Sequence, residues 1–314
     1  MKEPNIVVVG SLNMDIVIEA DRAPLEGETI MGNHSSFIPG GKGANQAVAL
    51  AKLGAQTTLL GTIGDDPFGT SLLRSLKDSG VETGKVKEVD NNPTGIASIL
   101  LAEGDNRIVV VPGANDDCLP DDIKEHEELI EKADLVLLQL EIPLATVTTA
   151  AKIAKKHGKT VILNPAPARS LPEKLLQNVD YITPNQSELG ILSKMDQDRF
   201  DLQKAMEIVQ ESGVDHVITT LGSEGAVYKS QESAVKTTPA HQVPVVDTTG
   251  AGDAFNAGLS YAIGLGKELS EAVSFASKVS ALAVTKFGAQ AGMPDRKEVE
   301  AFDAPPFNHN GTVN

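Results

Sequence analysis

Residues 135–163, LVLLQLEIPLATVTTAAKIAKKHGKTVIL, show most clearly how strands and helices alternate along this chain. Two short apolar runs, 135–139 and 160–163, enclose a segment, 144–157, in which apolar residues recur at three- and four-residue spacing. A short apolar run is typical of a strand buried on both faces, and the wider spacing is typical of an amphipathic helix. The stretch therefore predicts a strand–helix–strand unit that joins two parallel strands of one sheet.

The same alternation continues in both directions along the chain. Further buried strands are expected at 6–9, 57–60, 181–183, 216–220 and 226–229. Further helices are expected at 45–52, 69–79, 187–193 and 202–212, and the stretch from Ala254 to about Phe287 is strongly helical. Apolar strands separated by helices imply a mostly parallel central sheet with helices on both faces. The predicted fold class is therefore α/β.

Two stretches, 15–37 and 94–111, interrupt this alternation because they hold strand-like segments with no helix beside them. The segments are 16–18, 28–31, 96–101 and 107–111, with turns at 26–27 and 103–105. We predict that they form a small antiparallel β lid that stands off the main domain. Such a sheet exposes an apolar face that needs a partner, so a homodimer through the lid is also expected. The alternative is an extra hairpin packed on the edge of the core.

This interpretation divides the chain into two units and a tail. The main α/β domain, which would bind nucleotide and substrate, comprises 1–14, 38–93 and 112–303. The lid, which would also be the dimerisation subdomain, comprises 15–37 and 94–111. The Pro- and Asn-rich residues 304–314 are expected to form a disordered tail.

The composition limits the classes of function. The chain contains 43 Asp and Glu residues but only 27 Lys and Arg residues. The resulting net charge of −16 repels nucleic acid and anionic membranes. Aromatic residues make up only 4%, which is too few for a base-stacking surface. A single cysteine, Cys118, excludes an internal disulfide, and the six His show no metal-ligand spacing. No signal peptide or membrane-spanning run is apparent, so a soluble, cytoplasmic protein is expected.

The segment that carries most chemical information is DTTGAGDAF, residues 247–255, which follows the apolar run 243–246 and opens a long helix. Its glycines let backbone N–H groups approach an anion at the helix N-terminus, where the helix dipole favours negative charge. An Asp in a first helical turn is common without any function. A helix start needs only one cap, however, and here two Asp flank a run of small residues. We interpret Gly250, Ala251 and Gly252 as an anion hole for a transferring phosphoryl group, and Asp253 as the base that accepts the proton of the attacking hydroxyl.

Three other catalytic patterns are missing from the sequence. The Walker pattern G-x-x-x-x-G-K-[ST] does not occur, and Phe255 stands where the third glycine of a dinucleotide-binding fingerprint would fall. The G-x-S-x-G elbow of serine hydrolases does not occur either. These absences argue against a nicotinamide-dependent enzyme and against a hydrolase of that type.

Two segments near the N-terminus suit a polyhydroxylated ligand, and the second of them also suits the phosphate of such a ligand. GSLNMD, residues 10–15, follows the first predicted strand at the end where open α/β sheets bind ligands, and its Asn13 and Asp15 could bond adjacent hydroxyls. PGGKGANQ, residues 39–46, combines three glycines with the cation Lys42 and a helix start at Asn45. Each segment also has a purely structural interpretation, as turn chemistry or as a flexible helix entry.

Three further signals are weaker. TLGSEG, residues 220–225, has the small residues that a nucleotide phosphate or an adenine edge requires, although most such turns are only turns. Asn185 stands near a helix cap, and Glu188 in the first turn could bind Mg²⁺ through water or merely favour the helix dipole. Glu141 follows a strand and so points toward the ligand crevice.

Taken together, these segments resemble the ribokinase family of carbohydrate kinases over residues 6–302. The motifs GSLNMD, GGKGAN, NPAPA, TPNQSE and DTTGAGD stand at 10–15, 40–45, 164–168, 183–188 and 247–253, in the family's order and spacing. The last of them is highly specific. The GGKGAN form, with Asn13 and Asp15, is similar to the ribose-phosphorylating branch more than to the fructokinase or adenosine kinase branches. The resemblance implies ATP-dependent phosphorylation of D-ribose at the 5-hydroxyl, giving ribose 5-phosphate and ADP.

The resemblance also implies roles for individual residues. The sugar would be held by Asn13, Asp15, Gly41, Lys42, Asn45, Glu141 and Asp253. ATP would be held by Asn185, Thr220, Gly222, Ser223, Gly225, Gly252 and Ser277, with Glu188 supporting Mg²⁺ indirectly. A monovalent cation, K⁺, would bind at Asp247, Thr249, Ala283, Lys286, Gly288 and Gly292, the middle ones largely through backbone carbonyls, and would brace the anion hole.

The sequence departs from the family pattern at two of these positions. Ser277 stands where a larger polar side chain, His or Asn, is common beside adenine, and Gly292 stands where a Ser often completes the cation site. Two alternatives stay open: a kinase for deoxyribose, fructose, adenosine or a similar acceptor, and a catalytically silent sugar or nucleotide sensor. The intact loop 250–253 argues against the sensor, because a binding protein needs no base there.

Overall fold

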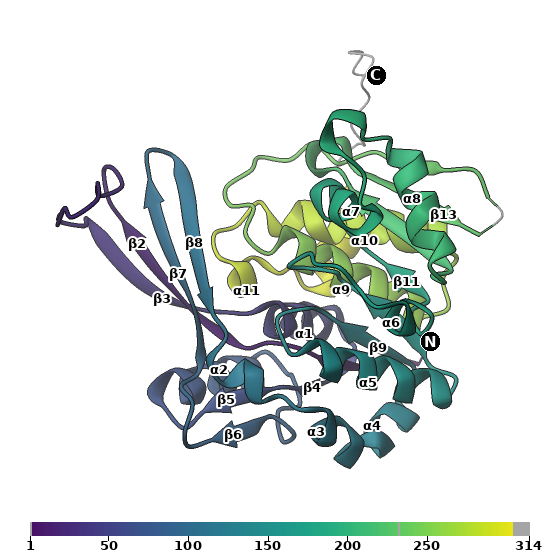
Figure 1. Cartoon of the computed structure of the whole chain (residues 1–314), viewed down its shortest axis with the longest axis horizontal. Coiled ribbons are helices and arrows are strands. Elements are labelled where there is room, and N and C mark those ends of the chain that lie inside the picture. Colours follow the sequence, from purple (N-terminus) through teal and green to yellow (C-terminus); the bar gives the residue numbers. More distant parts are fainter. Residues whose placement is uncertain (1, 232, 304–314) are drawn as a thin grey trace.

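An eight-stranded sheet forms the centre of the computed structural model, which describes residues 2–231 and 233–303 (Figure 1). Its strands are β1 (Asn5–Val9), β4 (Gln56–Leu60), β9 (Leu135–Leu138), β10 (Thr160–Leu163), β11 (Tyr181–Ile182), β12 (His216–Thr220), β13 (Ala226–Ser230) and β14 (Lys236–Thr238). They lie in the order β14-β13-β12-β11-β10-β9-β1-β4. All pairs from β12 to β4 are parallel, and the pairs β12–β13 and β13–β14 at one edge are antiparallel.

Helices cover both faces of this sheet, because successive side chains of its strands point to opposite sides. In β1, Ile6 and Val8 belong to one apolar cluster, and Val7 and Val9 belong to the other. The first cluster includes residues of α1 (Lys42–Leu53), α2 (Pro67–Asp78), α9 (Ala251–Gly264), α10 (Leu269–Ala283) and α12 (Arg296–Ala301). The second includes residues of α3 (Pro120–Glu125), α4 (Glu127–Lys132), α5 (Leu144–Lys156), α6 (Glu173–Leu176), α7 (Gln186–Ser193) and α8 (Leu202–Glu211). The predicted α/β class is confirmed.

The remaining elements are short. They are the paired strands β5 (Thr62–Gly64) and β6 (Lys87–Val89), the helix α11 (Ala289–Gly292), and the 3₁₀ turns η1 (Gly113–Asp117), η2 (Gln197–Arg199) and η3 (Gly222–Glu224). No helix within residues 2–231 and 233–303 is long and apolar enough to span a bilayer.

A second sheet, which we call the lid, projects from the main body (Figure 1). It contains β2 (Asn13–Glu19), β3 (His34–Gly40), β7 (Gly95–Ala102) and β8 (Asp105–Val111), in the order β3-β2-β7-β8. The outer pairs are antiparallel hairpins, as expected. The central pair, β2 and β7, is parallel, because each is the first strand of its hairpin and both run outward from the main body.

One expected lid strand is wrong. Residues 28–31 are irregular, and the partner of β2 is β3 (His34–Gly40) instead. The serines at 35 and 36 and the proline at 39 weaken the strand pattern of that segment. It forms a strand nevertheless because it lies at the edge of the lid, where a proline is tolerated.

The predicted division into domains stays a prediction, and the predicted tail, 304–314, lies outside the described residues. The lid strands β2 and β3 extend beyond the predicted segment 15–37 at both ends, since they begin at Asn13 and finish at Gly40.

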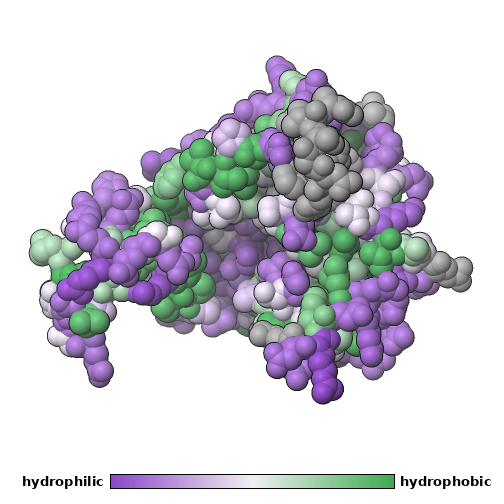
Figure 2. Space-filling model, turned by 90° about the horizontal axis from the view of Figure 1, so that it is seen from above, coloured by the Kyte–Doolittle hydropathy of each residue, from purple (hydrophilic) through white to green (hydrophobic). Residues whose placement is uncertain are grey.

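The arrangement of the parallel strands places the motifs. Parallel strands end at one edge of their sheet, which is where open α/β sheets bind ligands. GSLNMD follows β1, Glu141 follows β9, and Asn164 follows β10 at this edge. The helices α1 and α9 pack against each other on one face of the sheet, and each begins in one of the glycine-rich motifs. From above, the surface is hollowed between the lid and the main body (Figure 2).

Candidate active site

The predicted sugar-binding residues come from four parts of the chain. Asn13 and Asp15 lie at the start of β2; Gly41, Lys42 and Asn45 lie at the start of α1; Glu141 follows β9; and Asp253 lies in the first turn of α9.

Glu141 joins two of these parts. Its Oε2 accepts a hydrogen bond from the Ser11 hydroxyl at 2.5 Å and another from the backbone N–H of Lys42 at 3.0 Å. The start of α1 is thereby fixed against the loop that follows β1.

Two glycines allow this close approach. A Cβ on Gly41, whose φ is +89°, would lie 2.6 Å from the backbone nitrogen of Asn13. A Cβ on Gly43 would lie 2.5 Å from the backbone nitrogen of Ser11. These glycines therefore allow the backbone at the start of α1 to pack closely against residues 10–13. The amide of Gly43 donates to the Ser11 hydroxyl at 3.3 Å and is not available to a ligand.

Asp253 is buried, with 5% of its surface exposed, and two consecutive residues of α1 hold its carboxylate. Asn45 Nδ2 donates to Oδ2 and Gln46 Nε2 donates to Oδ1, both at 2.9 Å. Burial raises the pKa of Asp253, while the positive charge of Lys42 and these two amide bonds act against that rise. A carboxylate in this position is oriented by neutral donors and has limited contact with water.

Free amides stand beside this carboxylate. Gly250 caps α9 in the left-handed conformation, with a φ of +78°. Within the described residues, the backbone amides of Gly250, Gly252 and Asp253 donate to no protein acceptor, whereas the amide of Ala251 donates to the carbonyl of Thr248 at 3.2 Å. The helix N-terminus thus offers unpaired donors to an anion, and Ala251 contributes less than its neighbours.

The negative charges of four carboxylates act on the Lys42 ammonium. Burial lowers the pKa of Lys42, but the negative charges of Asp253, Glu141, Glu188 and Asp15 outweigh it and leave that pKa raised. Lys42 is therefore charged. It is a single cation in a cluster of acidic side chains.

The Asp15 carboxyl also belongs to this cluster, and its pKa is strongly raised. Burial, followed by the negative charges of Glu141 and Asp253, raises its pKa to about 7, although Lys42 lowers it. The carboxyl occupies space that a Cβ on Gly40 would fill.

We predict that Asp15→Asn stabilises the ligand-free protein more at pH 8 than at pH 5. A carboxyl with a raised pKa binds its proton more tightly in the folded state, so the folded protein loses stability as the pH rises from about 4 to about 7. The amide cannot ionise and escapes this loss. The melting temperatures of parent and variant at the two pH values measure the difference, and an equal effect at both would contradict the raised pKa.

The predicted nucleotide residues lie on neighbouring elements. Asn185 caps α7, Thr220 ends β12, Gly222 and Ser223 form η3 with Gly225 after it, and Ser277 is buried on α10. The amide of Thr220 donates to the carbonyl of Pro184 at 3.1 Å, which joins β12 to the start of α7. Among the described residues, no hydrogen bond or ion pair joins the turn 222–225 to the N-terminus of α9.

Asn185 and Glu188 form a capping box on α7. The Asn185 side chain accepts from the Glu188 amide, and the Glu188 side chain accepts from the Asn185 amide, both at 2.8 Å. The two residues therefore have a structural role at the start of α7. This role leaves room for a second one. Burial raises the pKa of Glu188, although the hydrogen bond from the Asn185 amide and the positive charge of Lys42 act in the opposite direction.

The predicted cation residues surround the start of α9. Asp247 Oδ1 accepts from the Thr249 amide and Oδ2 accepts from the Gly288 amide, both at 2.9 Å. A Cβ on Gly292 would lie 2.9 Å from the carbonyl oxygen of Ala283 and 3.5 Å from that of Lys286, so both oxygens point to the same small space. The Lys286 side chain pairs with Glu298 at 2.6 Å, which leaves only its backbone for such a site.

The apolar run before this loop is not a strand. Residues 243–246 are irregular, and Val245 and Val246 are more than 60% exposed. Backbone bonds from Val246 and Asp247 to the carbonyl of Val284, at 2.8 and 3.2 Å, hold the segment against the end of α10.

Several polar residues beneath the site were missed from the sequence. Asn115 accepts from the amide of Leu12 at 2.9 Å and donates to the Asn13 side chain at 2.8 Å. Gln46 contacts Asp253, as described above, and Gln139 contacts Gln46. Asn115 has no motif around it, but Gln46 directly follows Asn45 in a quoted motif, and Gln139 ends a predicted strand.

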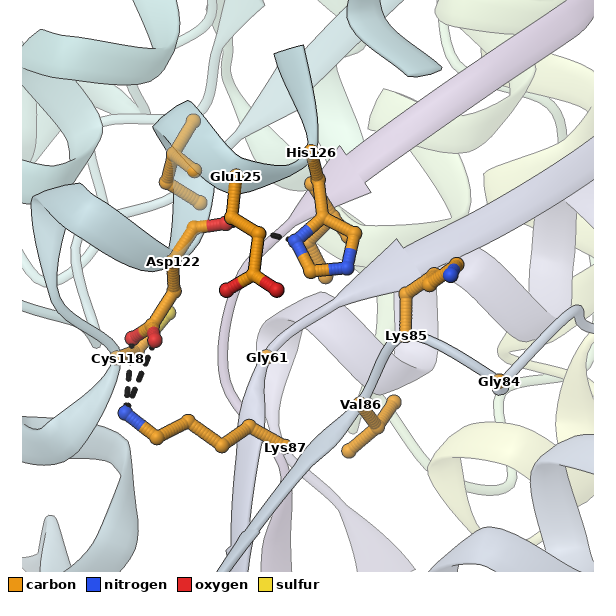
Figure 3. Close-up of a pocket in the computed structure, with 11 residues that line it drawn as sticks. Gly61, Gly84, Lys85, Val86, Lys87, Cys118, Asp122, Glu125 and His126 are labelled. Atoms are coloured by element: carbon orange, nitrogen blue, oxygen red, sulfur yellow. Dashed lines mark hydrogen bonds and ion pairs between the residues drawn. The ribbon is translucent and has the colours of Figure 1, made fainter. Parts of the chain in front are cut away.

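A separate cavity of about 300 Å³ lies between the loop 84–87 and α3 (Figure 3). It contains none of the predicted site residues. Its Lys87 bonds the carboxylate of Asp122 at 2.9 and 3.1 Å, while Lys85 and Glu125 add one positive and one negative charge to the lining.

Known proteins resemble this chain in sequence and in structure. Residues 3–296 match the pfkB family carbohydrate kinase pattern. The chain is 44% identical over 296 residues to the ribokinase of Bacillus subtilis, covering 94% of this chain and 98% of the relative. It is 36% identical over 301 residues to the deoxyribokinase of Salmonella typhi, covering 95% and 98%. The structure of Arabidopsis thaliana ribokinase complexed with ribose and ATP is similar with a TM-score of 0.89 and 38% identity, covering 96% of this chain and all of that one.

Proposed function

Because this chain belongs to the pfkB family of carbohydrate kinases, we propose that it transfers the terminal phosphoryl group of ATP to the 5-hydroxyl of D-ribose, giving ribose 5-phosphate and ADP. One observation carries the proposal: a buried carboxylate, Asp253, lies in the first turn of α9 beside amides that have no acceptor among residues 2–231 and 233–303. A base next to an anion site is what phosphoryl transfer to an alcohol requires.

The proposed reaction moves one proton and one phosphoryl group. The hydroxyl oxygen of the sugar forms a bond to the γ-phosphorus while the bond from that phosphorus to the bridging oxygen of ADP breaks. The hydroxyl proton goes to the Asp253 carboxylate. The amides of Gly250, Gly252 and Asp253 donate to the phosphoryl oxygens, whose negative charge they stabilise without reorganising.

The remaining side chains position the two substrates. Asn13, Asp15, Asn45 and Glu141 offer the acceptors and donors that a polyhydroxylated ligand needs, and Lys42 keeps the acidic cluster partly neutralised. The predicted nucleotide residues Asn185, Thr220, Gly222, Ser223, Gly225 and Ser277 are proposed to hold ATP. Positioning of this kind accounts for much of the rate enhancement in phosphoryl transfer.

Mg²⁺ is proposed to accompany ATP, with Glu188 supporting it through water. The donor set fits, since Glu188 uses one carboxylate oxygen to cap α7 and retains the other, and a carboxylate with water is a common Mg²⁺ environment. When bound, the ion neutralises charge on the phosphates.

A monovalent cation is proposed beside the anion hole. The carbonyls of Ala283 and Lys286 converge on the space next to Gly292, which suits a cation that prefers oxygen ligands. When bound, such an ion balances carbonyl dipoles near the loop 247–250. Asp247 and Thr249 at the start of that loop, and Gly288 after it, complete the proposed set.

We predict that replacing K⁺ by Na⁺ at constant ionic strength lowers kcat. The smaller ion cannot reach all the fixed carbonyls, so the loop beside α9 would be less well braced. Initial rates in the two buffers measure the effect, and Asp247→Asn should reduce the difference between them. Equal rates for the parent protein would remove K⁺ from the proposal.

A substrate panel tests the proposed reaction. ADP production is followed with ATP and ribose, 2-deoxyribose, fructose or adenosine as the acceptor. We expect the highest kcat/KM with ribose. A preference for deoxyribose would assign the activity of the Salmonella relative instead, and no acceptor-dependent ADP at all would support the sensor.

The lid is proposed to form the interface of a homodimer. Its strands expose large apolar side chains: Phe37, Val109 and Val111 on one face of the sheet, and Ile108 and Val110 on the other. An apolar face of this kind is typical of a surface that a second copy covers. A cytoplasmic location is proposed as well, since a cell's ATP is available there and the thiol of Cys118 is free.

A further inference from the structure

Asp253 has two side-chain partners that differ in their access to the crevice. Asn45, which is proposed to touch the sugar, is slightly exposed. Gln46 is completely buried and donates to Oδ1 of Asp253 at 2.9 Å. Gln46 therefore has no direct access to the crevice, and its contact with the reacting groups is through the carboxylate.

The amide of Gln46 has one permitted orientation. Its Nε2 donates both to Asp253 Oδ1 and to Asn164 Oδ1, at 2.9 and 3.1 Å, so a flipped amide would place oxygen against two acceptors. Asn164 is itself oriented, because its Nδ2 donates to the carbonyl of Thr183 at 3.4 Å. On the other side, the Oε1 of Gln46 accepts from Gln139 Nε2 at 2.6 Å.

The orientation of the Gln139 amide leaves one of its polar atoms without a hydrogen bond in the part of the chain that the structure describes. It is fully buried, and its Oε1 has no hydrogen-bond partner among the described residues. That oxygen lies where a Cβ on Gly10 would be, so only glycine at position 10 leaves it room. A buried acceptor without a partner is destabilising, and its retention here suggests that the donation to Gln46 is needed.

We propose that Gln139 and Gln46 form a buried amide relay that orients the Asp253 carboxylate and keeps it ionised, with Gln46 as the positioning residue. The inference rests on the proposed function. Two consecutive donors, Gln139 to Gln46 and Gln46 to Asp253, fix one carboxylate oxygen. The other oxygen, which within the described part of the chain is bonded by Asn45 alone, is left to take the sugar proton.

Charged groups around Asp253 also influence its ionisation. Lys42 favours the ionised form, and Glu141, Asp15 and Glu188 disfavour it. None of these groups bonds the carboxylate directly in the described structure, whereas Gln46 does. Removing Gln46 should therefore raise the pKa of Asp253 without changing the surrounding charges.

The test compares Gln46→Met and Gln139→Met with the parent protein. Methionine is similar in length to glutamine and cannot donate a hydrogen bond. We expect Gln46→Met to lower kcat by about 10- to 100-fold, with a change in KM for the sugar of less than about threefold. The acid limb of the kcat–pH profile should move up by about one pH unit, and Gln139→Met should give a smaller shift in the same direction. Gln210→Met on α8, whose amide bonds only the carbonyl of Asp215, is the matched control and should change neither quantity.

A second readout separates this inference from the proposed function. The pKa of Asp253 is measured in the ligand-free protein by carboxyl ¹³C NMR, with Asp253→Asn used to assign the signal. A higher pKa in Gln46→Met supports the relay even if the sugar acceptor proves to be another one. An unchanged pKa and an unmoved acid limb overturn the relay while the kinase activity of the parent stands. If Gln46→Met does not fold, the pKa of Asp253 and the acid limb of the kcat–pH profile are measured in Gln139→Met instead, and the same outcomes support or overturn the relay.

Discussion

Asp253→Asn is expected to lower kcat by about 10²–10⁴-fold or more, while the protein still binds ATP and ribose. The substitution removes the proton acceptor but retains the size of the side chain and one of its two oxygens, so the contacts with Asn45 and Gln46 are lost only in part. Since burial disfavours the charged form of Asp253, the neutral amide should not greatly destabilise the fold. Steady-state kinetics with calorimetric titration of ATP and ribose measure both quantities.

A matched substitution controls for the loss of a carboxylate in general. Asp201 caps α8 and accepts from the Lys204 amide at 2.9 Å, a role that asparagine performs equally well. Asp201→Asn should therefore leave kcat and stability unchanged. Near-normal turnover by Asp253→Asn would falsify its assignment as the base.

The second large effect is expected for Gly252→Ala. Gly252 lies in the first turn of α9, and a Cβ there would enter open space with nothing within 4 Å. The fold should accept the alanine and gain up to about 1 kcal/mol, because alanine is the better helix former. The same methyl group would project at the anion site. We expect kcat/KM for ATP to fall by about 10²–10³-fold, similar to the loss of one oxyanion donor.

Gly250→Ala is the informative comparison. Gly250 has a φ of +78°, and its Cβ would lie 3.0 Å from the Cβ of Ala289, so this alanine is strained wherever a ligand binds. We expect it to lower the melting temperature as well as the activity. If Gly252→Ala retained full activity, or lost activity only together with stability, the anion hole would not lie at this position.

The regular part of the fold could be predicted because local patterns determine it. The strands β10 and β12 have their predicted bounds, and α5 differs from its predicted segment only at the last residue. The lid strand β3 could not be predicted in this way, since its backbone pairing with β2 overrides a weak local preference.

The site could be predicted where one motif carries the chemistry. Gly250, Gly252 and Asp253 lie within four positions of the sequence. The first turn of α9 therefore brings them together without any contact to a distant part of the chain. The contact between Gln46 and Gln139 joins residues 93 positions apart, and the contact between Leu12 and Asn115 joins residues 103 apart. Spacing in the sequence contains no information on such pairs, because the order of the parallel strands decides which loop ends meet.

The acidic surroundings of Lys42 have a consequence for the end of the proposed cycle. The crevice receives an uncharged sugar, which the carboxylates of Asp15, Glu141 and Asp253 can bind through its hydroxyl hydrogens. After transfer it holds a phosphate ester with about two negative charges, and one ammonium cannot balance those and the carboxylates together. In the proposed cycle, the carboxylates of Asp15 and Glu141 therefore repel the ester more than they repel the sugar, which favours release of the product.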